Sequence, residues 1–279
     1  MDDFACRRGE APADDEVLAW APARTVLGDG VLWAPFDVVS LDFSRVVDGR
    51  LSQTSNGQAA HFEREAATVS ALLEVIERDA VASWFARTPT SRSRTTLSRG
   101  SIPYAWWRAL QASLDAAGVR VTLHELPAVG GYPCFLTELK DERSLGRGAI
   151  VVYGSACHVL PETALRQSVL EAVQSRVTEI AGARDDILYR TPPRDIGMGL
   201  AWPSPPDMPL RRWEDVLERE EGRHTASALA IAQRLAEAGY PQAAIIDLVA
   251  AEADVAVVKA FVPGLGANDR LRRPPQLQS

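Results

Sequence analysis

The stretch SNGQAAHFEREAATVSALLEVIERDAV, residues 55–81, decides the fold and contains the first candidate site. It begins with a Ser-Asn-Gly turn and continues into a long helix, predicted over residues 63–87, which a proline and a serine-rich loop end. Glu74 and Glu77 are three residues apart, so they lie about 60° apart on one helical face, with Ser70 one turn earlier. The opposite face is apolar and is predicted to pack on a core: Val69, Leu72, Leu73, Ile76 and Ala80.

The polar face of this helix suits a divalent metal with a polyphosphate. Carboxylate oxygens are ligands of Mg²⁺, and the guanidinium of Arg78 neutralises phosphate charge. The same spacing is also common on solvated helix faces, where such a pair contributes only about 0.2–0.5 kcal/mol. Ser55-Asn56-Gly57 alone is likewise a common turn. The residue pattern therefore leaves a binding site and a solvated face as alternatives.

The run from Ser55 to Ala80 resembles the central motif of the YcaO family. A second segment, residues 154–186, resembles the part of these proteins in which a strand ends, a helix begins, and Glu, Gln and Arg side chains are presented. Together the two motifs place the resemblance over about residues 20–265. The second motif consists of Gly154-Ser155-Ala156-Cys157-His158, Pro161-Glu162, Ala164-Leu165, Glu171-Ala172, Gln174-Ser175-Arg176 and Gly182-Ala183-Arg184-Asp185-Asp186.

This resemblance implies ATP and Mg²⁺ as cofactors and phosphorylation of a backbone amide oxygen in a peptide substrate. Attack by a Cys, Ser or Thr side chain would then give an azoline, by sulfide a thioamide, and by an amine an amidine. By motif position, the implied magnesium ligands are Glu74, Glu77 and Glu171. The implied nucleotide contacts are Ser55, Asn56, Ser70, Arg78, Gln174, Arg176 and Arg184. Because Arg176 lies about 140° from Glu171 around the helix, the second motif relies more on Glu171 and Gln174.

The chain differs from the family pattern at three places. YcaO proteins usually carry another acidic helix upstream of the Ser-Asn-Gly turn, and no such helix is predicted in residues 1–54. Phe62 stands where the family has Asn, and Ala66 where it has Glu, so polar atoms that could support nucleotide or metal are missing. The tail offers only Pro274-Pro275 where azoline-forming relatives have alternating prolines, which disfavours azoline relative to thioamide formation.

Two functional hypotheses follow, and a third is unrelated to the resemblance. The first is an ATP-dependent peptide-modifying enzyme, with a site that a partner completes. The second is a catalytically inactive YcaO paralogue that binds a peptide or an active enzyme as a scaffold. The third is a generic α/β domain whose motifs are coincidental. The expected partners are a precursor peptide and a TfuA-like protein or second YcaO chain, in a homo- or hetero-oligomer.

Composition bounds these hypotheses. The chain has 279 residues, 46% of them hydrophobic, which is enough for one sizeable core. A net charge of −7 argues against nucleic acid as a partner. With neither a long apolar stretch nor a secretory signal, we expect no membrane span and a cytoplasmic location. Residues 1–16 are predicted as a disordered leader, 17–268 as a single domain and 269–279 as a disordered tail.

The predicted fold class is α/β (α+β), a mixed sheet covered by helices, in a YcaO-like domain that lacks the usual N-terminal part. The Arg-rich stretch 87–99 is either a mobile solvated loop or an anion contact. Cys157 beside His158 is either a nucleophile–base pair or a packed strand end. Further helices are predicted at 104–117, where Trp107 is more often a core residue than a ligand stack, from Pro161 onward, with an apolar stripe of Val169, Val173, Val177 and Ile180, and at 222–238. Strands are predicted at 119–126, 134–139, 149–153 (central in its sheet, with a turn after it at 154–158), 243–249 and 255–261.

Overall fold

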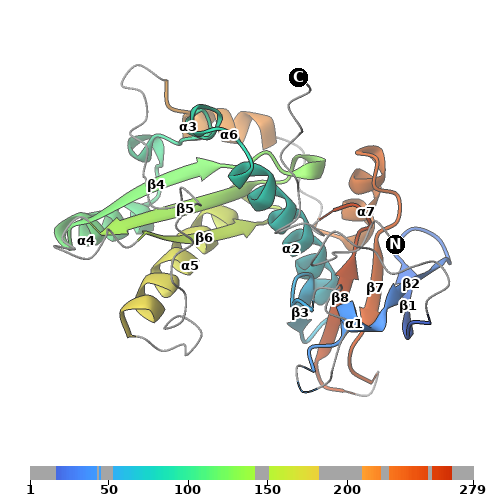
Figure 1. Ribbon diagram of the computed structural model, residues 1–279. Helices are drawn as coiled ribbons and strands as arrows, with labels where there is room; N and C mark the ends of the chain where they lie inside the picture. The colour runs from blue at the N-terminus through green and yellow to red at the C-terminus, as the bar shows by residue number, and fades with distance from the viewer. Residues whose placement is uncertain are drawn as a thin grey trace, which may run out of the picture. The chain divides into compact units, whose positions relative to one another are not determined.

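The computed structural model describes residues 17–42, 44, 53–141, 151–181, 209–220, 226–250 and 253–265 (Figure 1). The chain divides into two compact units. Unit 1 comprises residues 1–86, 127–132 and 225–279, and unit 2 comprises residues 87–126 and 133–224. The predicted leader and tail lie outside the described residues, and the assignment of a single domain to residues 17–268 stays a prediction.

Unit 1 is built on a five-stranded antiparallel sheet with the order β2-β1-β7-β8-β3. It combines strands from the two ends of the chain, since the C-terminal pair β7-β8 lies between β1 and β3. The strands are β1 (Trp20–Thr25), β2 (Val31–Pro35), β3 (Gln58–His61), β7 (Ala244–Asp247) and β8 (Ala256–Phe261).

The long motif helix of unit 1, α2, spans Arg64–Phe85 and packs on β8 and β3. Its predicted apolar face is buried except at Val69, which is half-buried, and Leu72 and Ile76 are fully inaccessible. The Glu65 carboxylate accepts a hydrogen bond from the Ala228 N–H (2.7 Å), which fixes the start of α7 (Ala228–Glu237) against α2. The other helices of this unit are α1 (Phe36–Val39), η2 (Val129–Gly131) and α7 (Ala228–Glu237).

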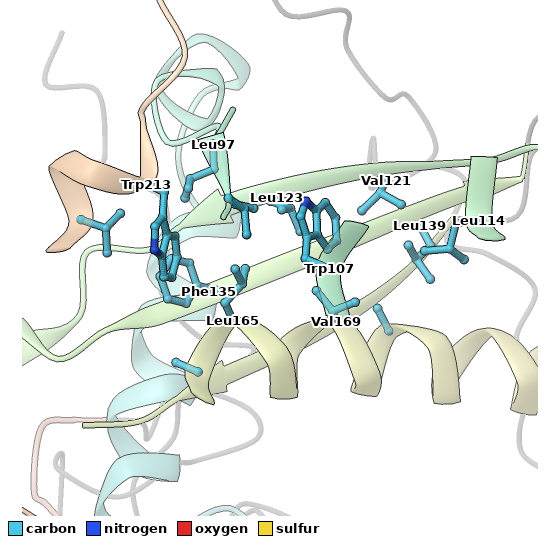
Figure 2. Close-up of a cluster of buried hydrophobic side chains, with 14 of the residues drawn as sticks. Leu97, Trp107, Leu114, Val121, Leu123, Phe135, Leu139, Leu165, Val169 and Trp213 are labelled. Atoms are coloured by element: carbon cyan, nitrogen blue, oxygen red, sulfur yellow. The ribbon is translucent and has the colours of Figure 1, made fainter. Parts of the chain in front are cut away.

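Unit 2 contains a three-stranded antiparallel sheet with the order β4-β5-β6, and the helix α5 (Pro161–Ala181) packs on β5 and β6. Its core holds Trp107, Phe135 and Trp213, all at most 1% exposed (Figure 2). Trp107 is therefore a core residue, as predicted, and not a ligand stack. The other elements are α3 (Pro89–Ser93), η1 (Arg99–Ser101), α4 (Ala105–Ala116), β4 (Val119–Glu125), β5 (Cys134–Asp141), β6 (Val151–Cys157) and α6 (Trp213–Glu220).

The helix α5 differs from its predicted apolar stripe. Val177 and Ile180, predicted to face the core, are 58% and 59% exposed. The 21 residues of α5 span about 31 Å, whereas the seven residues of β6 span about 23 Å. The last turns of α5 therefore extend beyond the end of the strand on which the helix packs. The buried stripe ends earlier and comprises Ala164, Leu165, Ser168, Val169 and Ala172.

The strand β6 also differs from the prediction. It lies at the edge of its sheet rather than in the centre, and it continues through Cys157 instead of turning at Gly154. Cys157 is buried opposite Cys134, and the His158 Nδ1 accepts the Leu160 N–H (3.0 Å). Both observations agree with a packed strand end rather than a nucleophile–base pair.

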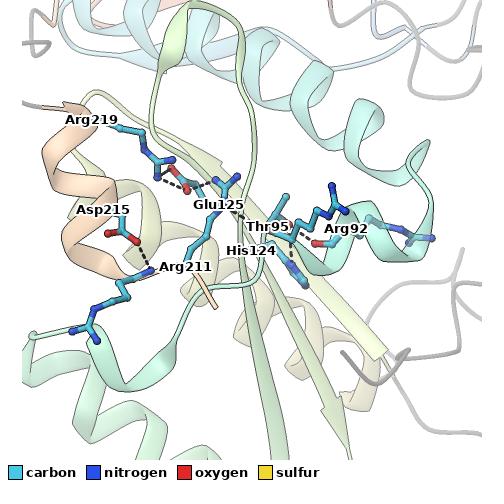
Figure 3. A network of polar contacts seen from close by, with 9 residues as sticks. Arg92, Thr95, His124, Glu125, Arg211, Asp215 and Arg219 are labelled. Carbon is cyan, nitrogen blue, oxygen red and sulfur yellow. Dashed lines mark hydrogen bonds and ion pairs between the residues drawn. The ribbon is translucent and has the colours of Figure 1, made fainter. Parts of the chain in front are cut away.

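A polar network fastens the Arg-rich stretch and α6 to β4 (Figure 3). Glu125 accepts hydrogen bonds from Arg211 (2.6 Å) and Arg219 (2.7 Å). The neighbouring His124 is buried against Thr95 (3.2 Å), and burial lowers the pKa of His124 to about 4. The stretch 87–99 holds α3 and buried residues, so its interpretation as a mobile solvated loop is wrong. The helix α6 is not among the helices predicted from the sequence.

Among the helices that the structure describes, none combines the length and the apolar character that crossing a membrane requires.

Candidate nucleotide and metal site

The Ser-Asn-Gly turn is locked between β8 and α2 by its glycine. Gly57 has a φ of +75°, and a Cβ at this position would lie 2.7 Å from the Ala260 carbonyl oxygen and 2.9 Å from Val75. The Gly57 carbonyl accepts the Ala260 N–H at 2.7 Å. Only glycine fits this conformation and this close approach, so the turn is held in one place beside α2. Ser55 is exposed and Asn56 partly buried on this turn.

The acidic stripe of α2 is brought together as predicted. Arg78 lies between the two carboxylates, with its Nε 3.7 Å from Glu74 Oε1 and its Nη2 3.5 Å from Glu77 Oε1. Glu77 is only 8% exposed, so the alternative of a solvated helix face is wrong for this residue. Ser70, one turn before Glu74, is exposed.

The carboxyl group of Glu74 lies in an environment that disfavours its charge. Burial and then the neighbouring Glu77 raise the pKa of Glu74, against the opposing effects of Arg78, the Gly57 backbone and Lys259. A bound divalent cation would stabilise the ionised forms of Glu74 and Glu77, because it would offset both their desolvation and their mutual repulsion. The donor set therefore fits Mg²⁺ with a phosphate group, with carboxylate oxygens for the metal and two cationic side chains for the phosphate.

Lys259 on β8 is a member of this site that the sequence did not reveal. It is 1% exposed, its Nζ donates to the Thr54 carbonyl oxygen beside the turn, and it lies over the Phe261 ring at 5.8 Å from the centroid. Burial lowers the pKa of Lys259 to about 8, although Glu74 acts in the other direction. The available signal was a single lysine within an apolar strand, and this is rare unless the charge is paired or used.

The second motif lies in unit 2, on α5 and β6. Gly154 lets the strand backbone touch the helix, because a Cβ there would be 2.1 Å from the Ala172 nitrogen. Glu171 is partly buried and accepts the Ser155 N–H at 2.9 Å, while Gln174 is exposed.

Arg176 and Arg184 are less well supported as nucleotide contacts. Arg176 forms an ion pair with Asp141 of β5 at 3.0 Å, in keeping with its position away from the Glu171 stripe. Arg184 lies outside the described residues. Since the stripe of α2 belongs to unit 1 and Glu171 to unit 2, a joint site stays a prediction.

Over the described residues, no group of three or more His, Cys, Asp or Glu side chains could hold a metal ion. A cavity of about 310 Å³ in unit 1 is lined by Arg24, Arg64, Glu65 and Thr68, among others, on the side of α2 opposite Glu74 and Glu77. This cavity is therefore separate from the acidic stripe.

The similarity to known proteins extends over nearly the whole chain. The family model for YcaO cyclodehydratases, described as ATP- and Mg²⁺-binding, matches residues 3–266. An uncharacterised protein from the tfuA 3′ region of Rhizobium leguminosarum bv. trifolii is 26% identical over 91% of this chain and 63% of its own length. An uncharacterised protein of Methanothermobacter thermautotrophicus is 30% identical over 89% of this chain and 65% of its own length. The chain thus spans about two thirds of the length of these relatives.

Solved structures show the same fold. A heterocyclase in complex with substrate and cofactor superposes with a TM-score of 0.71 at 20% identity, over 94% of this chain and 35% of that one. YcaO from Methanopyrus kandleri, bound with AMPPCP and Mg²⁺, gives a TM-score of 0.66 at 23% identity, over 92% of this chain and 69% of that one. The predicted α+β class is confirmed by this likeness, with antiparallel pairing in both described sheets.

Proposed function

Because the chain belongs to the YcaO family, we propose that it takes part in the ATP- and Mg²⁺-dependent modification of a ribosomally synthesised peptide, in the cytoplasm. The observation that carries this proposal is the cluster of Glu74, Glu77, Arg78 and Lys259 beside the Gly57 turn. Arg78 lies within 3.7 Å of both carboxylates, and Glu74 interacts with the Gly57 backbone and with the charge of Lys259.

Each side chain has a role that its chemistry suits. Bound ATP supplies the phosphoryl group for a backbone amide oxygen, and Mg²⁺ neutralises the phosphate charge. Glu74 and Glu77 hold the metal through their oxygens. Arg78 and Lys259 face the phosphates, and the exposed hydroxyls of Ser55 and Ser70, with Asn56, contact the nucleotide. Glu171 and Gln174 are proposed to complete the site, with smaller contributions from Arg176 and Arg184.

The proposed product is an azoline or a thioamide. The relative from a tfuA 3′ region supports a TfuA-like partner, in addition to a precursor peptide or a second YcaO chain. We also propose that the protein acts in a homo- or hetero-oligomer, in which a partner completes the site.

A second candidate is an inactive scaffold that binds a peptide or an active YcaO enzyme without turnover. It is favoured by Phe62, which is 79% exposed where the family pattern has an amide, and by Ala66. An apolar ring facing solvent cannot provide the hydrogen bonds of asparagine, and alanine offers no ligand atom.

Calorimetry with Mg·ATP tests the site. The double variant Glu74→Gln/Glu77→Gln should keep the fold but lose nucleotide affinity by about 100-fold or more, since each charged contact contributes about 1.5–3 kcal/mol. The matched control Glu218→Gln/Glu237→Gln removes two exposed carboxylates and should bind as wild type does. Equal affinity of wild type and the first variant would contradict the site. Binding without ADP release, in the presence of precursor peptide and partner, would favour the scaffold.

A further inference from the structure

One face of the β1–β2 hairpin carries large apolar side chains in solvent. We call this the β1–β2 face; it consists of Trp20, Pro22, Arg24, Val31 and Trp33. Pro22 is opposite Trp33 and Arg24 is opposite Val31, and facing residues of an antiparallel pair project to the same side. Trp20, Val31 and Trp33 are 41%, 53% and 57% exposed.

The other side of the same hairpin is fully used. Ala23 and Ala34 are buried there, in a cluster with Val38 and Val39 of α1. The long helix α2 packs on β8 and β3, at the far end of the sheet order from β2. Within the described part of the chain, this face is uncovered at its tryptophans, while Arg24 at its end also lines the cavity that Arg64 and Glu65 of α2 line. Two exposed tryptophans on one face are unusual for a surface that contacts only solvent.

The strand β2 is also open along its outer edge. Hydrogen bonds from Thr25 to Gly30 (2.9 Å) and from Phe36 to Ala19 (2.8 Å) fix which residues of β2 bond to β1. Because this role alternates along an antiparallel strand, the N–H and C=O groups of Val31 and Trp33 point outward. In the described residues β2 pairs with β1 alone, so these groups can template a further strand.

Arg24 gives the face a charge preference. It is exposed, and the described residues include no carboxylate in ion-pair contact with it; the nearby Asp247 is held by Arg64 in two hydrogen bonds of 2.7 and 3.0 Å. A strand added to β2 would lie two strand spacings from β1, about 10 Å. The Arg24 side chain and a glutamate side chain on the added strand can together span the distance between these two strands, because only Val31 lies between them.

We propose that the outer edge of β2 binds an extended peptide segment as an additional strand, with apolar side chains against Trp33 and an acidic side chain toward Arg24. The proposal rests on the proposed function in taking a peptide as the occupant. Main-chain hydrogen bonds would supply affinity, and the tryptophans and Arg24 would supply selectivity.

A second copy of the chain fits this edge less well. Two-fold pairing of β2 with itself about Trp33 would place Pro35 opposite Val31, and proline has no N–H to donate. In that arrangement the residue beyond Val31 and the second copy's Pro35, in line with Arg24, would be the second copy's Trp20. Arg24 would therefore have no carboxylate opposite it in the second copy. A peptide with a carboxylate satisfies both the backbone and Arg24.

Short random peptides displayed on phage, selected on the full-length protein without nucleotide, test this proposal. Enriched peptides should alternate apolar residues around an acid and should bind by fluorescence anisotropy. Trp33→Lys should weaken them at least about tenfold, while Ile180→Ser, which removes an equally exposed apolar side chain from α5, should not. Arg24→Glu should weaken the same peptides, and replacing their acid by lysine should restore binding to that variant.

Three outcomes would overturn the inference: no enrichment, equal binding to Trp33→Lys, or a wild-type dimer that this variant converts to monomers, as light scattering would detect. The last would assign the edge to a second copy of the chain. Peptide binding that persists in Glu74→Gln/Glu77→Gln would separate this surface from the nucleotide site, so failure of one leaves the other standing.

Discussion

Lys259 should reduce the stability of the protein at neutral pH. Its side chain is buried, and burial lowers its pKa from 10.5 to about 8. The unfolded chain therefore binds more protons between pH 8 and 10.5, and the free energy of unfolding must rise with pH through this window. At 1.36 kcal/mol per pKa unit, the protonated lysine costs about 3 kcal/mol at pH 7.

Replacing Lys259 with methionine isolates this cost. Methionine keeps the unbranched shape and removes the amine, but it also loses the hydrogen bond to Thr54, which is worth about 1 kcal/mol. We expect Lys259→Met to be about 2 kcal/mol more stable than wild type at pH 7. This advantage should shrink by about 2 kcal/mol when the pH is raised to 9.5, because the wild-type lysine then releases its proton.

Urea denaturation followed by tryptophan fluorescence, with EDTA to remove metal, measures both quantities. Lys140→Met, which removes a lysine of unit 2, shows whether the loss of any lysine gives the same pH dependence. Parallel stability curves for wild type and Lys259→Met between pH 7 and 9.5 would refute the reasoning. Calorimetry on the same variant should show weaker Mg·ATP binding, because a lysine kept at a cost in stability is expected to serve function.

Three further predictions concern unit 2. Gly154→Ala should lower the free energy of unfolding by about 3 kcal/mol or more, because the added Cβ would lie 2.1 Å from a backbone nitrogen of α5. Urea denaturation measures this, and the control Gly100→Ala should change little, because its Cβ would have no atom within 4 Å. Glu125→Gln should lower the free energy of unfolding by about 1–3 kcal/mol, because it weakens the contacts with Arg211 and Arg219. Arg212→Gln removes an exposed ion pair and should lower it by less than about 0.5 kcal/mol. Equal losses for the two variants would contradict the importance of the network. His124 has a pKa of about 4 when folded and 6.5 as a model value, so wild type should lose up to about 3 kcal/mol as pH falls from 6.5 to 4, and His124→Gln should lose less.

The helices with strong periodicity could be predicted from the sequence, and shorter or context-dependent features could not. The predicted helix 63–87 is observed as α2 over Arg64–Phe85, because its apolar spacing repeats over six turns. The eight residues of α6 give too short a pattern for such a signal. The burial of Val177 and Ile180 was mispredicted because periodicity cannot show where the supporting strand ends.

The candidate site shows the same division. Glu74, Glu77 and Arg78 are neighbours on one helix, so their proximity follows from local geometry. Lys259 comes from a strand nearly two hundred residues away, and only the antiparallel pairing of β3 with β8 brings it beside the turn. A prediction from sequence could place the stripe on α2 but not the second cation that faces it.

The geometry of this cluster favours a ligand site over a structural ion network. Arg64 and Asp247 form a short ion pair of 2.7 Å. Arg78 instead lies 3.7 Å from Glu74 and 3.5 Å from Glu77. In the same place the pKa of Glu74 is raised and that of Lys259 is lowered, chiefly by burial, so both groups are poorly stabilised in their charged forms. Opposite charges gathered in a desolvated place are typical of a site that binds a charged ligand, and a metal-bound phosphate would stabilise all of them at once.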